Sequence, residues 1–148
     1  MASTRNQNLR GYFLHCNNGK TIRDYIGIPY ADKGRSRSGL DCYGLLQLWM
    51  SEQLGISIPD YLEVYTSSSD RDSVAGAIAE NKVGWTPVED PEFGDALLFN
   101  ILGAPMHVGI KLDGNDFLHA FQNCDSCIER LDGVAWSRRL VGAYRWVT

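Results

Sequence analysis

The sequence predicts an α+β fold in which helices come first and a mostly antiparallel sheet of five to six strands follows. Residues 41–54 carry apolar side chains at helical spacing, at Leu45, Leu46 and Trp49, in register with Cys42. From about residue 95 onward the pattern changes to short segments rich in branched and aromatic residues, which is typical of strands. Helices and strands collected in separate parts of a chain indicate an α+β domain.

A single domain is expected over residues 1–148. This length is enough to bury a hydrophobic core, and we see no internal repeat and no linker. Residues 1–20 are polar, and we expect them to be loosely ordered.

Three helices are predicted. Thr21 to Asp24 has the spacing of a capping box and begins a short helix that ends near Gly27. The main helix is expected from about Asp41 to Leu54, followed by a glycine stop. A third is expected over residues 73–80.

Two segments between these elements are interpreted as irregular. Residues 31–39 indicate a loop whose basic side chains, Lys33, Arg35 and Arg37, face solvent. Residues 84–94 are rich in proline and acidic residues and are interpreted as a connector. The strands are expected at Ala96–Ile101, His107–Leu112, Asp116–Phe121, Cys127–Leu131 and Leu140–Val147.

The turn between the second and third predicted strands fixes where two histidines lie. Asp113-Gly114-Asn115 is a turn signal, and a three-residue loop pairs Leu112 with Asp116. In that register His107 and His119 are diagonal neighbours on one face of the sheet, close enough to hydrogen-bond. A loop one residue shorter would separate the histidines and divide the apolar side chains between both faces. Burial therefore favours the register that brings the histidines together.

Cys42 is expected at the start of the main helix, directly after a loop that contains Gly39. A helix N-terminus lowers the pKa of a thiol, and the thiolate is the reactive form. A cysteine there, together with two histidines on neighbouring strands, predicts a nucleophile with its base. The alternative is structural, because a buried cysteine is usually a small hydrophobic residue and a strand histidine is usually part of the core.

Composition and charge argue against several classes of protein. The net charge is −4 and there is no basic stripe, so nucleic acid is not the expected partner. No apolar run approaches the roughly 20 residues of a membrane span. The N-terminus lacks the apolar core of a secretory signal, so we expect synthesis in the cytoplasm without export by that route.

The Cys124-x-x-Cys127 spacing raises the question of a metal or a disulfide. A structural zinc ion needs two more ligands, and the adjacent pair His15 and Cys16 has a poor spacing for them. We therefore expect two unbridged thiols, no metal and no cofactor.

Five segments of the chain together resemble the NlpC-type cell-wall cysteine peptidases of the papain-like superfamily. The resemblance extends over about residues 20–146. Its segments, in order, are Tyr25-Ile26-Gly27-Ile28-Pro29-Tyr30, Asp41-Cys42-Tyr43-Gly44-Leu45, Gly94-Asp95-Ala96-Leu97-Leu98-Phe99, His107-Val108-Gly109-Ile110 and Phe117-Leu118-His119-Ala120. The closing segment, residues 138–146, is similar to tail-associated members found in bacteriophages.

This resemblance implies roles for individual residues. Cys42 matches the nucleophile, His107 the base and His119 the orienting third residue. Three further positions match the substrate site: Tyr30, Asp41 and Tyr43. At Tyr43 the family usually has a serine that helps to hold the free end of the stem peptide, so this position departs from the pattern. A thiolate–imidazolium pair of Cys42 and His107 is expected.

The resemblance also implies an activity. The family hydrolyses amide bonds in the peptide stems of bacterial peptidoglycan, usually between D-glutamate and the diamino acid. The expected partners are the stem peptide and phage tail proteins, and the expected location is a virion tail acting at the host cell wall. Three alternatives stay open: another amide hydrolase or acyltransferase on the same triad, a tail assembly protein that keeps only the fold, and a zinc-binding module.

Overall fold

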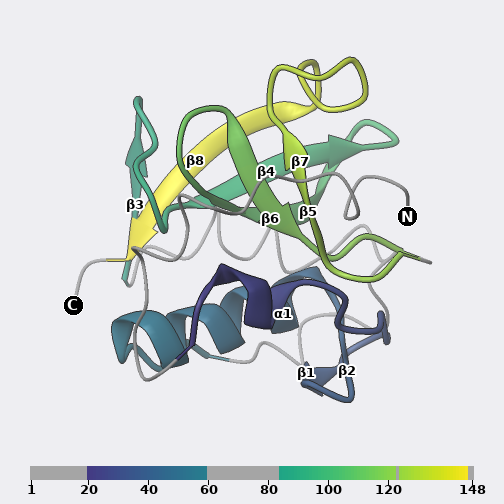
Figure 1. The fold of residues 1–148 in the computed structure, drawn as a ribbon. Coiled ribbons are helices and arrows are strands. Elements are labelled where there is room, and N and C mark those ends of the chain that lie inside the picture. The colour runs from purple at the N-terminus through teal and green to yellow at the C-terminus, as the bar shows by residue number, and fades with distance from the viewer. Residues whose placement is uncertain (1–19, 60–83, 123, 147–148) are drawn as a thin grey trace.

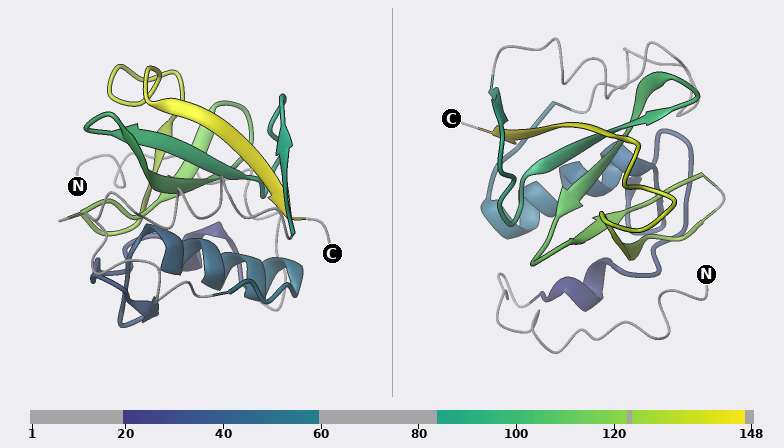
Figure 2. Two further views of the ribbon diagram at one scale, coloured as in Figure 1. Left: turned by 180° about the vertical axis from the view of Figure 1, so that it is seen from behind. Right: turned by 90° about the horizontal axis from the view of Figure 1, so that it is seen from above.

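The computed structural model describes residues 20–59, 84–122 and 124–146, and it has two layers. A helical layer lies against one side of a six-stranded sheet (Figure 1). The views from behind and from above show the same arrangement (Figure 2). This confirms the predicted α+β fold. The expectations for residues 1–19 and for a helix at 73–80 lie outside the described residues.

The first layer contains a 3₁₀ helix, a small hairpin and the main helix. Their bounds are η3 (Ile22–Tyr25), β1 (Arg35–Ser36), β2 (Gly39–Leu40), α1 (Cys42–Trp49) and the π-helical turn η4 (Met50–Leu54). The Thr21–Asp24 capping box is present at η3. Gly55 ends the helical segment in a left-handed conformation, with φ of 67°. The predicted helix limits are therefore confirmed.

The sheet is antiparallel at every pairing, in the order β3-β8-β4-β5-β6-β7. Its strands are β3 (Trp85–Val88), β4 (Ala96–Ile101), β5 (Ala104–Lys111), β6 (Asp116–His119), β7 (Cys127–Arg130) and β8 (Leu140–Trp146). The five predicted strands are all present. The predicted hairpin register is confirmed as well, since Ile110 pairs with Leu118 and Lys111 with Phe117.

Two segments that we interpreted as irregular contain strands. Residues 85–88 form β3, which pairs with β8 at the edge of the sheet. Pro87 obscured this strand in the sequence, but an edge strand tolerates proline because one side of its backbone needs no ladder hydrogen bond. Within residues 31–39, Arg35 and Ser36 form β1, which pairs with β2.

The basic side chains of that hairpin are not simply solvated, which corrects the prediction. Arg35 pairs with Asp41 at 2.8 Å, and Arg37 pairs with Glu52 at 2.6 Å. Both acids belong to or adjoin the main helix, so the hairpin is held against the helical layer.

The main hydrophobic core lies between the helices and the sheet. Trp49 and Leu46 from α1 are fully buried there. The β5–β6 hairpin contributes the five residues predicted for its apolar face: Val108, Ile110, Leu112, Leu118 and Ala120. A second cluster covers the other face of the sheet, with Phe99, Phe117 and Trp136 at its centre. His107 and His119 contact the rings of this second cluster.

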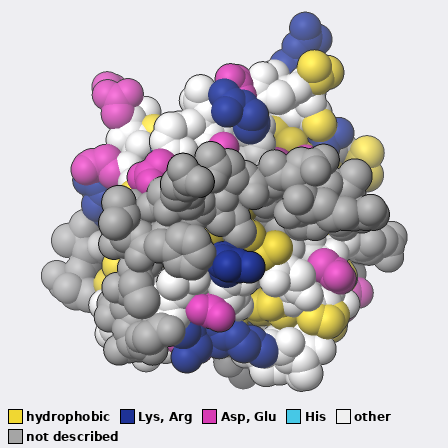
Figure 3. All heavy atoms as spheres, viewed as in Figure 1, with side chains coloured by type: hydrophobic (Ala, Val, Ile, Leu, Met, Phe, Trp, Pro, Cys, Tyr) yellow, Lys and Arg dark blue, Asp and Glu magenta, His cyan; other side chains and the backbone are white. Residues whose placement is uncertain are grey.

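Charge is mixed on the surface. In the described part of the face drawn in Figure 3, Lys and Arg side chains lie among Asp and Glu side chains. Among the described residues, no helix has the length and apolar character needed to cross a bilayer.

Candidate active site

Asp41 determines how α1 begins. Its Oδ1 accepts hydrogen bonds from the Gly44 backbone N–H and from Arg35 Nη1, both at 2.8 Å, and its Oδ2 accepts from the Lys33 N–H at 3.2 Å. This is an N-cap contact combined with a buried ion pair. Asp41 therefore joins the hairpin to the helix and places Cys42 as the first residue of α1.

Gly44 allows the close approach that this junction needs. A Cβ at this position would lie 2.1 Å from the Gly34 carbonyl oxygen. Backbone atoms cannot move aside as a flexible side chain can, so only glycine fits in the first turn of α1.

One pocket contains three of the predicted site residues. Cys42, His107 and Tyr30 line it, from α1, β5 and the segment before β1. The rest of the lining is mainly apolar: Ile101, Leu102, Met106, Ala120, Phe121 and Gln122. Two chain segments separated by more than 60 residues thus bring a thiol and an imidazole to the same cavity. The backbone of Val108, next to His107, hydrogen-bonds to Cys42.

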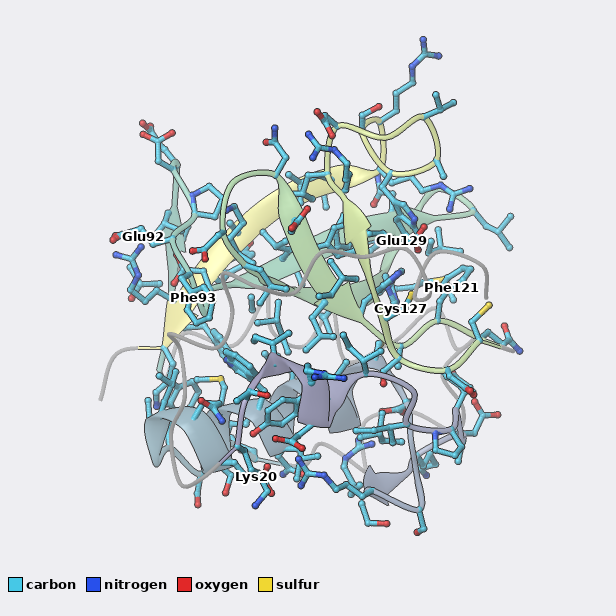
Figure 4. All side chains as sticks on the ribbon, in the orientation of Figure 1. Lys20, Glu92, Phe93, Phe121, Cys127 and Glu129 are labelled. Carbon is cyan, nitrogen blue, oxygen red and sulfur yellow. The ribbon has the colours of Figure 1, made fainter. Side chains whose placement is uncertain are left out.

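His119 lies behind His107 and does not line the pocket. His107 Nε2 and His119 Nδ1 are 2.8 Å apart, and both rings are almost completely buried. The other nitrogen of His119, Nε2, is 2.6 Å from Glu129 Oε2 on β7. Trp136 Nε1 donates to the same carboxylate oxygen at 3.1 Å. In Figure 4, Glu129, Cys127 and Phe121 lie together at the end of the sheet that contains β7.

Glu129 and Trp136 were not predicted as part of the site. Glu129 pairs with Phe117 across the β6–β7 ladder and is therefore a diagonal neighbour of His119. Strand alternation would have indicated Glu129 once that register was known, but no short turn reveals the register in the sequence. Trp136 comes from the segment between β7 and β8, which has no strand pattern.

The electrostatics of Cys42 differ from the prediction. Burial, followed by the negative charge of Asp41, raises the pKa of the thiol to about 12. Burial also lowers the pKa of His107 well below 6.5, and neighbouring His119 and Arg139 act in the same direction. Burial thus favours the uncharged forms of both groups, which is opposite in direction to the expected thiolate–imidazolium pair.

Two predicted substrate-site residues do not reach the pocket. Tyr43 is fully buried in the main core, where its hydroxyl donates to the Pro59 carbonyl and Arg35 lies 5.3 Å from its ring centre. Asp41 is 1% exposed and is used in the helix cap. Tyr30 does line the pocket, and its hydroxyl donates to Asp32 Oδ1 at 3.3 Å.

One group of side chains has the donors of a zinc site. The ligand atoms of His119, Cys127 and Glu129 lie within 4.8 Å of one another. A nitrogen, a sulfur and an oxygen donor suit Zn²⁺. The His119–Glu129 hydrogen bond already joins two of the three residues. Cys124, the other member of the Cys-x-x-Cys pair, is not in this group, and neither cysteine is disulfide-bonded.

A comparison of the sequence with models of protein families shows which family the chain belongs to. The model of the NlpC/P60 family matches residues 27–145. This chain belongs to the NlpC/P60 family. The resemblance inferred from the sequence segments is thereby confirmed at the level of the family.

Known relatives agree with this assignment. "Murein DD-endopeptidase MepS/Murein LD-carboxypeptidase" of Escherichia coli K12 is 25% identical over 122 residues, which are 82% of this chain and 57% of that protein. "Probable peptidoglycan endopeptidase LytE" of Bacillus subtilis is 28% identical over 82% of this chain and 31% of its own length. The chain thus spans about half or less of these relatives.

A solved structure shows the same fold. The NLP/P60 family protein from Staphylococcus aureus Mu50, described as similar to a lipoprotein, has a TM-score of 0.60 and 29% sequence identity. The match covers 84% of this chain and 38% of that one. The papain-like α+β fold of the NlpC/P60 domain is therefore shared.

Proposed function

We propose that this protein is a cysteine peptidase that hydrolyses amide bonds in the stem peptides of bacterial peptidoglycan. The observation that carries the proposal is the pocket shared by Cys42 and His107, with His107 hydrogen-bonded through Nε2 to His119. We assign these three residues as the nucleophile, the base and the orienting residue of a triad. Membership of the NlpC/P60 family and the printed names of the murein and peptidoglycan endopeptidases support the substrate class.

In this mechanism the thiol transfers its proton as it attacks. Since burial favours the uncharged thiol and imidazole, His107 takes the Cys42 proton while the sulfur forms a bond to the amide carbonyl carbon. The resulting imidazolium gives that proton to the leaving amine, and an acyl-enzyme remains. His107 then removes a proton from water, which attacks the thioester and releases the acid and the Cys42 thiol.

The start of α1 supplies donors for the oxyanion. The first N–H groups of a helix have no partner within the helix, and the Gly44 N–H is taken by Asp41. The N–H of Cys42 is thus suited to donate to the carbonyl oxygen as it becomes negative. Loss of one such donor costs about 10²–10³ in rate in other hydrolases.

The bond and the biological setting are finer parts of the proposal. We infer cleavage between D-glutamate and the diamino acid from the family resemblance. The closing residues 138–146 support association with a phage tail and action at the host cell wall.

The experiment is mass spectrometry of soluble fragments released from purified peptidoglycan. The parent protein is compared with Cys42→Ala, and Cys124→Ala serves as the matched control because that cysteine lies outside the pocket. We expect fragments ending at D-glutamate from the parent and the control only. Digestion by Cys42→Ala would refute the nucleophile.

The lining of the pocket favours one alternative. Ile101, Met106 and Phe121 surround Cys42 with apolar surface, which also suits the acyl group of another amide or ester. If no peptidoglycan is digested, acyl p-nitrophenyl esters of increasing chain length test for acyl hydrolysis or transfer at Cys42. Inactivity on both substrate types would favour a tail protein that keeps only the fold.

A further inference from the structure

We propose that Glu129 is a positioning residue that fixes which ring nitrogen carries the proton in both histidines and thereby leaves His107 Nδ1 unprotonated. This role rests on the proposed function, since it prepares His107 to act as the base for Cys42. The geometry that carries it is the continuous hydrogen-bonded series from His107 through His119 to Glu129.

The argument begins at the carboxylate. Glu129 Oε2 lies within hydrogen-bond distance of His119 Nε2 and accepts from Trp136 Nε1, and a glutamate carboxylate is ionised near neutral pH, so it can only accept. Its Oε2 lies 2.6 Å from His119 Nε2, which must therefore carry the hydrogen. His119 is almost completely buried among the rings of Phe117, Phe121 and Trp136, an environment that favours the neutral ring with a single N–H. Nδ1 of His119 is consequently an acceptor.

The position of the hydrogen on His119 determines the position of the hydrogen on His107. His119 Nδ1 accepts, so His107 Nε2, 2.8 Å away, must donate. His107 is also buried against aromatic rings, which favours its neutral form, and its one hydrogen is then on Nε2. The remaining nitrogen, Nδ1, has a free lone pair. A base that receives the thiol proton needs this tautomer.

Trp136 supports the carboxylate from the other side. Its indole N–H donates to the same Oε2 at 3.1 Å, and Arg139 lies over the indole ring at 5.0 Å. An indole N–H can only donate, so it cannot reverse the direction of the series. The N–H groups of Trp136 and His119 therefore both donate to Glu129, and the N–H of His107 donates to His119.

Glu129 also has an effect during the reaction. When His107 takes the Cys42 proton it becomes positively charged, and a carboxylate one ring away favours that charge. Arg139 opposes it by lowering the pKa of His107. Removal of the carboxylate should thus lower the catalytic rate and shift its pH dependence, while substrate binding is little changed.

The test is ¹⁵N NMR of the histidine rings, because the chain has only three histidines. We expect the parent to show both His107 and His119 protonated at Nε2. Glu129→Leu removes the acceptor and should produce a second tautomer at both rings. Glu129→Gln should keep the tautomers, because the Trp136 N–H holds the amide oxygen toward His119. A proton on His119 Nδ1 in the parent would overturn the inference.

Kinetics then test the consequence. We expect Glu129→Leu to lower kcat about 10–100-fold, the range typical for loss of a partner that orients a histidine, with KM little changed. Glu129→Gln should lose less and show a shifted pH profile. Glu92→Leu, at the other end of the sheet, is the matched acid-to-leucine control (Figure 4). Unchanged tautomers and kcat in a folded Glu129→Leu would refute the role.

The two proposals fail in different ways. If the parent releases nothing from peptidoglycan but the NMR tautomers respond to Glu129→Leu as expected, the proposed function fails and the tautomer assignment stands. If the parent is active and the tautomers differ from those expected, only the role of Glu129 fails.

Discussion

The two ends of the sheet each hold an acidic side chain in a hydrogen-bonded network, but its partners differ. Asp95 is 4% exposed and accepts from Arg145 Nε and Nη2 at 2.9 and 2.8 Å. Glu129 instead accepts from His119 and Trp136. A guanidinium never gives up its proton in a protein, so the first network can only hold the backbone in place. Neutral imidazoles can gain and lose protons, so the second network can support proton transfer.

The largest contrast between these ends is expected from removing one member of each network. His107→Gln should lower hydrolysis by at least about 10³-fold, because the thiol loses its base. Asp95→Asn should leave kcat within about twofold and should lower the free energy of unfolding, since the almost fully buried Asp95 loses its charge-assisted hydrogen bonds to Arg145. Rates on peptidoglycan and urea denaturation measure the two effects. Equal loss of activity in both variants would contradict the view that only the histidine network takes part in proton transfer.

Stability should depend on pH through the histidine network. Burial lowers the pKa values of His107 and His119 below 6.5, so below about pH 6.5 the unfolded chain binds protons that the folded chain does not. Stability should therefore be greatest above pH 6.5 and decrease as the pH falls. The lowered pKa of Glu129 acts in the same direction at lower pH, because the stabilising ionised form is lost.

Urea denaturation from about pH 8 to pH 5 tests this dependence. The double variant His107→Gln with His119→Gln should have a flatter profile over the lower part of that range, below about pH 6.5. A profile as steep as that of the parent would place the responsible groups elsewhere.

Removing the charge of Asp41, the N-cap residue of α1, should have a smaller effect, on the acidity of Cys42. Asp41 raises the pKa of Cys42, and Arg35 lowers it. Asp41→Asn keeps an oxygen that can cap α1 but removes the negative charge, so the thiol should become more acidic. The alkylation rate of Cys42 by iodoacetamide near pH 8 should rise several-fold relative to the parent, with Cys16→Ala, Cys124→Ala and Cys127→Ala in both backgrounds to isolate the signal. A slower rate would mean that the cap controls access to Cys42 and not its acidity.

The smallest effect is expected from chelation. The proposed steps use no metal, so EDTA should leave the rate of hydrolysis unchanged within error. Added Zn²⁺ should inhibit, because a metal on His119 Nε2 would place the ring proton on Nδ1 and reverse the hydrogen bond to His107. Cys127→Ala should weaken that inhibition. Loss of activity with EDTA would require a metal-dependent mechanism.

The β5–β6 hairpin shows how much of the site the sequence predicts. A three-residue turn and the apolar alternation around it were enough to place His107 and His119 on one face, since any other register would expose the core. The helix start near Cys42 was also predicted correctly, from the glycine-containing loop before it and the apolar spacing after it. Edge strand β3 was missed because its pairing with β8 spans about 60 residues and its Pro87 argues locally against a strand.

By itself, the sequence determined the main helix, the five central and C-terminal strands, the hairpin register and the candidate triad, because these depend on local turn chemistry and on side-chain periodicity. Only the tertiary structure decided the surroundings of those side chains. It placed Glu129 and Trp136 behind His119, buried Tyr43 against Pro59, and raised the pKa of Cys42 through burial and Asp41. Desolvation and long-range pairing depend on the positions of residues far apart in the chain, and a local pattern carries no information about them.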